Sequence, residues 1–152
     1  ATPSFPEHSL KLFGAYICDG SQQVSLRTTV THATGNCYSS QLFKGILRGS
    51  SRSDFAGRII VSHGAEKTES YQENHNLLLS DKAMATTRPE LEIYADDVNC
   101  NHGATVGRLS AEEQFYMRSR GISIEEARRL QIISFLSAAL TGFPEGVIEE
   151  AI

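Results

Sequence analysis

The chain has 152 residues, of which 40% are hydrophobic and 21% are charged, and its net charge is −4. This composition predicts one globular domain with a hydrophobic core and excludes a disordered chain. The sequence carries no basic patch, no apolar run near the ~20 residues of a membrane-spanning helix and no signal-peptide pattern, so we expect neither nucleic acid nor membrane as a partner.

Short strands separated by turns are predicted over the first half of the chain. Four segments are apolar or alternate between apolar and polar residues, and Gly, Asn and Ser punctuate them: 11–18, 24–32, 38–48 and 55–62. In the second segment, Val24, Leu26, Thr28 and Val30 share one face. Residues 66–75 are polar and predict an exposed strand or a loop, and residues 76–79 predict a short buried strand.

The secondary structure of residues 84–88 is ambiguous from the sequence. The segment is expected to end before Pro89, because a proline restricts the residue ahead of it to extended geometry. Beyond it, Leu91 and Ile93 are expected on one face of a strand, opposite Glu90, Glu92 and Tyr94.

The spacing of the strands favours a stacked architecture over tight hairpins. Apolar centres at Ile60, Leu78, Leu91 and Val106 recur at wide, irregular steps. Such steps are typical of the rungs of a β-solenoid, in which each rung buries its apolar positions against its neighbours. A β-sandwich is the alternative, and periodicity alone does not decide between the two.

Residues 110–152 predict a small helical domain that follows a β part over residues 1–109. Ser110 with Glu113, and Ser123 with Glu126, form two capping boxes. The first helix is expected to end at Gly121. The second should carry the apolar stripe Ala127, Leu130, Ile133, Leu136 and Leu140 and end at Gly142. Pro144 would start a short last helix that reaches about residue 150.

Cys100 and His102 are the one close pair of soft metal-ligand types, within the stretch 91–110. Residues i and i+2 of a strand point to the same face, so this thiol and imidazole can share one ligand. They suit iron, an Fe–S cluster or zinc. Two ligands do not make a stable site, so further ligands would come from elsewhere or from another chain. From spacing alone, the preferred interpretation is a small buried cysteine beside a surface histidine.

The remaining chemistry-bearing residues have simpler explanations. The three cysteines form no C-x-x-C pair, which indicates reduced thiols in a cytoplasmic protein, with Cys18 and Cys37 in the core. We expect the histidines at strand ends or turns, His32, His63 and His75, to lie on the surface. Asp96 and Asp97 should bond local amides in a turn, and Arg128 and Arg129 should lie on a solvated helix face. No G-x-S-x-G, P-loop or H-E-x-x-H motif occurs.

Four segments make the chain resemble the C-terminal part of a known family: NLLLSD (76–81), PELEIYADD (89–97), HGATVG (102–107) and FYMRSRGI (115–122). The family is SufB/SufD, of the SUF system for iron–sulfur cluster assembly. Ala83 stands where SufB members carry a cysteine, which favours the SufD branch. The resemblance implies a right-handed parallel β-helix followed by a small C-terminal α-helical domain. The chain begins Ala-Thr-Pro without Met, as a processed protein or an excised fragment would; we expect a fragment, and the resemblance implies that it is C-terminal.

The resemblance also implies a function. The expected role is a non-catalytic scaffold subunit that pairs with SufB through the β-helix and binds the SufC ATPase through its C-terminal helices. The helix residues expected at the ATPase are Phe115, Arg118, Arg120, Arg128 and Leu130. A transient Fe–S cluster would be shared with SufB, with His102 as a ligand and Cys100 beside it. This chain would bind no cofactor tightly, and ATP would be bound by SufC alone.

Two other functions remain open at this point. The first is a carbohydrate-active β-solenoid enzyme, for which Asp96 and Asp97 with Arg88 or Arg108 form a weak candidate site. The second is a purely structural interaction module. A solenoid with an exposed rung edge would also allow a homodimer in isolation.

Overall fold

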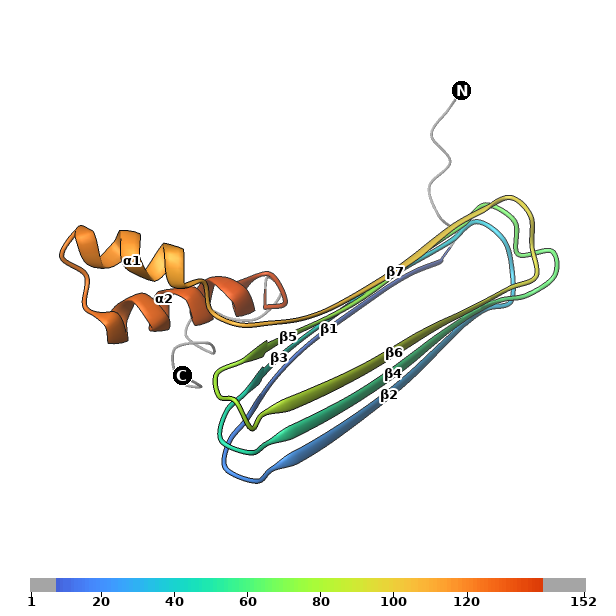
Figure 1. The fold of residues 1–152 in the computed structure, drawn as a ribbon. Helices are drawn as coiled ribbons and strands as arrows, with labels where there is room; N and C mark the ends of the chain where they lie inside the picture. The colour runs from blue at the N-terminus through green and yellow to red at the C-terminus, as the bar shows by residue number, and fades with distance from the viewer. Residues whose placement is uncertain (1–7, 141–152) are drawn as a thin grey trace.

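The computed structural model describes residues 8–140, and these fold into a β-solenoid followed by two helices (Figure 1). The strands are β1 (His8–Cys18), β2 (Gln23–His32), β3 (Cys37–Leu47), β4 (Arg52–Val61), β5 (Thr68–Leu78), β6 (Met84–Ile93) and β7 (Val98–Gly107). The helices are α1 (Ala111–Ser119) and α2 (Ile124–Ser137). The predicted β-solenoid with C-terminal helices is therefore confirmed, and the sandwich is excluded.

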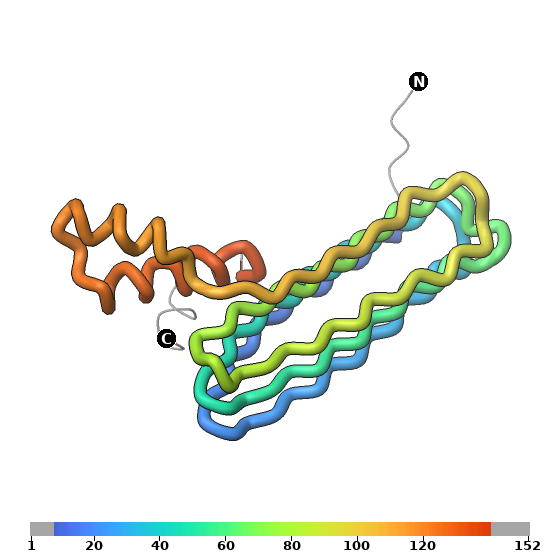
Figure 2. Tube along the Cα trace, viewed as in Figure 1, coloured from blue at the N-terminus to red at the C-terminus, as the bar shows by residue number. Residues whose placement is uncertain are grey.

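The strands form two parallel sheets. The odd-strand sheet has the order β1-β3-β5-β7, and the even-strand sheet has the order β2-β4-β6. The chain crosses from one sheet to the other after every strand, so successive rungs stack on one another, as Figure 2 shows. Because the register is continuous along each ladder, inward side chains form columns along the solenoid. One column consists of Leu12, Gln41, Gln72 and His102.

The interior has an apolar part and a polar part. Phe55, Ile59 and Val61 of β4 are buried in the apolar part. The polar part lies on the odd-strand sheet, where six inward side chains are at most 1% exposed: Ser39, Gln41, Ser70, Gln72, Asn74 and Asn76. Some of them bond one another, as Asn76 does by donating from Nδ2 to Asn74 Oδ1 at 2.8 Å. Such bonds offset the loss of water around buried polar groups.

This polar interior makes the prediction for residues 66–79 wrong. They form no exposed strand or loop followed by a separate short strand; instead, β5 is one strand from Thr68 to Leu78. Its polar residues at even positions point inward, where neighbouring rungs offer polar partners.

The ambiguous segment 84–88 is a strand, and its predicted end before Pro89 is wrong, because β6 continues through Pro89 to Ile93. β6 is an edge of the even-strand sheet, and edges are where sheets tolerate a residue that cannot donate a ladder hydrogen bond. Leu91 packs against the apolar cluster of Ile59 and Val61, as expected for an inward residue.

α2 lies against the outer face of the odd-strand sheet. Leu136 of α2 packs on Ile46 of β3 and Leu77 of β5, with Leu109, Ile132 and Phe135 around them. Lys44 Nζ also donates to the carbonyl oxygen of Phe135 at 2.7 Å. α1, which is described over its whole length, has no buried residue.

The serine N-cap of each predicted capping box is confirmed, whereas the Glu113 and Glu126 carboxylates contact Gln131 and Arg129 instead. Ser110 Oγ accepts from the amide of Glu113 at 3.2 Å, and Ser123 Oγ accepts from the amide of Glu126 at 3.1 Å. Gly121 follows α1 with a φ of 87°, the left-handed geometry of a helix C-cap. α2 ends at Ser137, before Leu140, so its predicted end at Gly142 is wrong, and the predicted last helix falls outside the described residues. Neither described helix is long and apolar enough to span a membrane.

Candidate functional site

The candidate site lies where the solenoid is open. After β7 the chain turns into α1, so within residues 8–140 no further strand of the even-strand sheet faces β7. Cys100 follows Ser70 in its column, and His102 follows Gln72. Since Ser70 and Gln72 point into the interior, Cys100 and His102 point to the same inner side of the sheet. At the open end of the solenoid, no described strand of the even-strand sheet covers that side. The two side chains thus share one face.

Cys100 and His102 differ in their surroundings. Cys100 is half-buried and packs against the cluster of Ile59, Val61 and Ala65, whereas His102 is exposed. Burial raises the pKa of the Cys100 thiol, and a hydrogen bond with the main chain of Ser70 opposes that rise. The thiol is therefore protonated at neutral pH, and a metal that binds it must displace a proton.

Below Cys100, a hydrogen-bonded column runs through the interior. Ser39 Oγ and Ser70 Oγ lie 2.6 Å apart, and His32 Nε2 lies 2.9 Å from Ser39 Oγ. His32 is 6% exposed, so its predicted surface position is wrong. The sequence did contain a signal, because His32 continues the inward series of Val24 to Val30 at every second residue.

The burial of His32 predicts a dependence of stability on pH. Burial lowers the pKa of His32, so below the unfolded value of 6.5 the unfolded chain binds more protons than the folded one. His32 should therefore not change the free energy of unfolding above pH 6.5, and it should lower that free energy as the pH falls below 6.5. We expect the urea midpoint to decrease between pH 7.5 and pH 5.5, and to decrease less in His32→Gln. Equal decreases in both proteins would contradict this assignment.

The other cysteines and histidines form no second site. Cys18 packs with Leu47 in the core, and the Cys37 thiol donates to the carbonyl oxygen of Thr34 at 3.2 Å. The ring of exposed His63 lies 5.3 Å from that of Tyr94. His75 bonds Thr105 Oγ1 and Glu73 Oε2 on the outer face of β5 and β7. Among the described residues, no group of three or more His, Cys, Asp or Glu could hold a metal ion.

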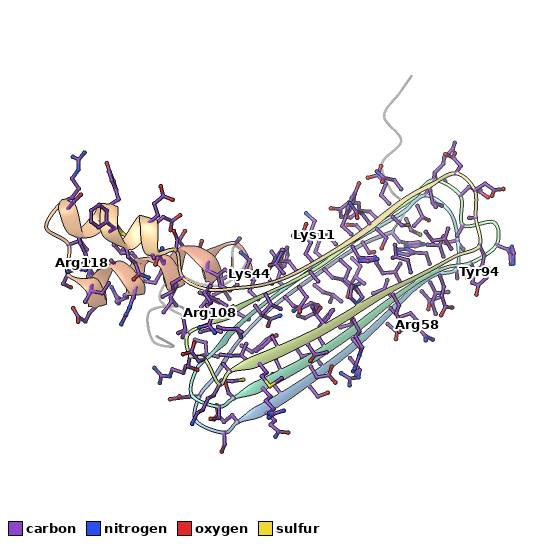
Figure 3. The ribbon with its side chains drawn as sticks, in the orientation of Figure 1. Lys11, Lys44, Arg58, Tyr94, Arg108 and Arg118 are labelled. Carbon is purple, nitrogen blue, oxygen red and sulfur yellow. The ribbon has the colours of Figure 1, made fainter. Side chains whose placement is uncertain are left out.

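The weak carbohydrate-active site is not assembled. Arg88 donates to Asp54 at 2.8 Å, and Arg108 pairs with Asp81 at 2.9 Å. Figure 3 shows Arg108 beside the helices and Tyr94, which precedes the Asp96–Asp97 turn, at the opposite end of the solenoid. In that turn, the Glu66 carboxylate accepts from the Asp97 amide at 2.7 Å.

The five helix residues expected at a partner are all exposed. Phe115 is 74% exposed, Leu130 is 39% exposed, and Arg118, Arg120 and Arg128 are exposed as well. The Arg120 guanidinium lies 5.1 Å from the centre of the Tyr116 ring. Leu130 also lines a groove of about 940 Å³ between the two helices and the end of β5, together with Tyr116, Met117 and Phe135. The helical pair therefore combines exposed aromatic and basic side chains with an apolar groove.

Comparison with known proteins identifies the family. Residues 6–135 match the family described as "SUF system FeS cluster assembly, SufBD core domain". The chain is 48% identical over 115 residues to the iron–sulfur cluster assembly protein SufD of Escherichia coli, covering 76% of this chain and 27% of that protein. It is 37% identical over 135 residues to SufD of Bacillus subtilis, covering 88% and 31%, respectively.

An iron–sulfur cluster assembly SufBD family protein of Synechocystis is 39% identical over 128 residues, which cover 84% of this chain and 28% of that protein. The chain thus spans about a third or less of the length of these relatives. The matched region contains all seven strands, α1 and most of α2. The chain belongs to the SufB/SufD family of SUF iron–sulfur cluster assembly proteins, and among its members it resembles SufD.

Proposed function

We propose that this chain is part of a non-catalytic scaffold subunit and supplies half of a cluster-binding site that a SufB-type partner completes. One observation carries the proposal: Cys100 and His102 point over the open end of the solenoid, where no described strand faces them. A thiolate and an imidazole suit iron, but two ligands are too few for a cluster. The missing ligands therefore come from the second chain, and the cluster is the cargo that both chains hold.

The open end also offers a surface for that partner. Ile93 of β6 and Val106 of β7 are inward positions, yet they are 42% and 45% exposed. The edges of β6 and β7 present unpaired main-chain groups, which a second solenoid can bond while it buries the apolar side chains. Pro89 removes a donor from β6, so β7 is the better edge for pairing.

The helical pair is the proposed binding site for a SufC-type ATPase. α1 exposes Phe115 and Tyr116, and the groove between the helices is lined by apolar side chains of both helices, with charged and polar residues around them. An apolar groove flanked by exposed aromatic residues suits a partner's helix. ATP would be bound by that partner, since this chain has no P-loop.

A substitution on α1 tests the ATPase site. Phe115→Asp, made in the full-length protein and co-expressed with the SufB- and SufC-type subunits, should lower the recovery of the SufC-type subunit about tenfold or more, as expected for an exposed aromatic anchor. Recovery of the SufB-type subunit should not change. Quantitative gel analysis of the affinity-purified complex measures both.

Tyr94→Asp is the matched control, because Tyr94 is a 52% exposed aromatic residue far from the helices (Figure 3). It should leave the SufC-type subunit in place. Full recovery of that subunit with Phe115→Asp, or equal losses in the two variants, would refute the proposed binding site.

A further inference from the structure

Gln72 is a buried amide that the fold leaves without a partner. Its side chain is fully buried, and neither Nε2 nor Oε1 has a hydrogen-bond partner among the described residues. Gln41, one position down the same column, is in the same condition. Buried polar side chains are nearly always hydrogen-bonded, so an unpaired pair of amides calls for an explanation.

The position of Gln72 relates it to the candidate site. Gln72 is the register partner of His102 on the neighbouring strand, and adjacent strands lie ~4.8 Å apart. On the facing sheet, Gly57 makes room for the amide, since a Cβ there would overlap all three of its terminal heavy atoms. The amide thus extends inward against Gly57 of β4, and its neighbour in the column on the strand above is His102.

His102, for its part, needs a hydrogen-bond acceptor if it is a ligand. When one imidazole nitrogen binds a metal, the other nearly always donates its N–H to an oxygen that fixes the ring and its tautomer. No described residue bonds the His102 ring in this structure.

We propose that Gln72 is the positioning residue for His102, accepting at Oε1 the imidazole N–H that faces away from the cluster iron. This inference rests on the proposed function, because it requires His102 to be a ligand. It explains why the Gln72 amide has no partner here, because its hydrogen bond with His102 forms only when the cluster holds the imidazole ring.

The test compares Gln72→Met with Gln41→Met in the full-length protein, in complex with its SufB-type partner. Met has nearly the volume of Gln but offers no comparable acceptor. We expect Gln72→Met to release iron and sulfide from the anaerobically reconstituted complex about tenfold faster or more, the usual effect of losing such a support. Gln41→Met, whose amide is one strand farther from His102, should retain the cluster as the parent does.

Two further measurements separate positioning from a structural role. Neither substitution breaks a described hydrogen bond, so urea midpoints should stay equal or rise in both variants. In a His102→Ala background, Gln72→Met should cause no additional loss of iron. A lower midpoint together with an additional loss would assign Gln72 a structural role and overturn the inference.

The controls also distinguish this inference from the function on which it rests. If His102→Ala retains the cluster as the parent does, the ligand role of His102 fails, and the inference fails with it. If His102→Ala loses the cluster while Gln72→Met and Gln41→Met behave alike, the inference alone is wrong.

Discussion

Replacing His102 with alanine in the full-length protein should lower cluster delivery about tenfold or more in cells that lack other assembly routes. The imidazole is exposed on the last strand and points over the open end, so its loss removes a proposed ligand without opening the core. The activity of an Fe–S enzyme in those cells measures delivery, and anaerobic iron analysis of the purified complex measures the cargo.

His75→Ala is the matched control for this experiment. His75 lies on β5, the strand next to β7, but it points to the outer face and bonds Thr105 and Glu73. It should deliver clusters as the parent does. Undiminished delivery by His102→Ala would remove His102 from the ligand set, and a purely structural interaction module would become the better description.

The second large effect is expected at the contact between α2 and the solenoid. Leu136 is 2% exposed between Ile46 and Leu77, and a carboxylate there would be buried among apolar side chains, and the nearby Lys44 ammonium already bonds the Phe135 carbonyl oxygen. Leu136→Asp should therefore cost about 4 kcal/mol or more of docking free energy. The helices should separate from the odd-strand sheet while the interior of β4 stays folded. Faster hydrogen exchange and proteolysis in α2, with unchanged exchange in β4, would demonstrate this.

Leu130→Asp gives the comparison on the same helix. Leu130 is 39% exposed and lines the groove, so a charge there should leave the helices docked and reduce only the recovery of the SufC-type subunit. If both variants show the same exchange pattern in α2, Leu136 does not anchor the helix. If both retain the SufC-type subunit, the groove is not its binding site.

The sequence predicted most strands and both helix starts, because these depend on local patterns. Alternation marked β2, and the two Ser–Glu pairs marked the N-termini of α1 and α2. Which strands pair could not be predicted from those patterns. β1 pairs with β3 and not with β2, its neighbour in sequence, and only this long-range pairing separates a solenoid from a sandwich.

The errors at residues 66–79 and at His32 share one physical cause, the assumption that polar residues of a strand face water. In β5, the residues Ser70, Gln72, Asn74 and Asn76 face inward, because stacked rungs can bond polar side chains to one another. His32 was misplaced for the same reason. The alternation itself was present in the sequence, but polarity alone did not reveal which face was inside.

For the candidate site, the sequence could show that Cys100 and His102 share a face, since that follows from the two-residue period of a strand. It could not show that this face is the inner one, or that the solenoid is open there. Both facts depend on the register with Ser70 and Gln72 and on the absence of a facing strand in the described residues. Gln72 was missed because its proposed role depends on that register.

The register also determines where the length of the chain can change during evolution. His8 pairs with Cys37 and Gln23 with Arg52, both 29 positions later, whereas Arg52 pairs with Met84, 32 positions later. The extra residues lie in the corners, and the strands keep 10 or 11 residues. A residue inserted within β5 would turn every later side chain of that strand inside out, while one inserted in a corner would not. Insertions and deletions among relatives should therefore fall in the corners.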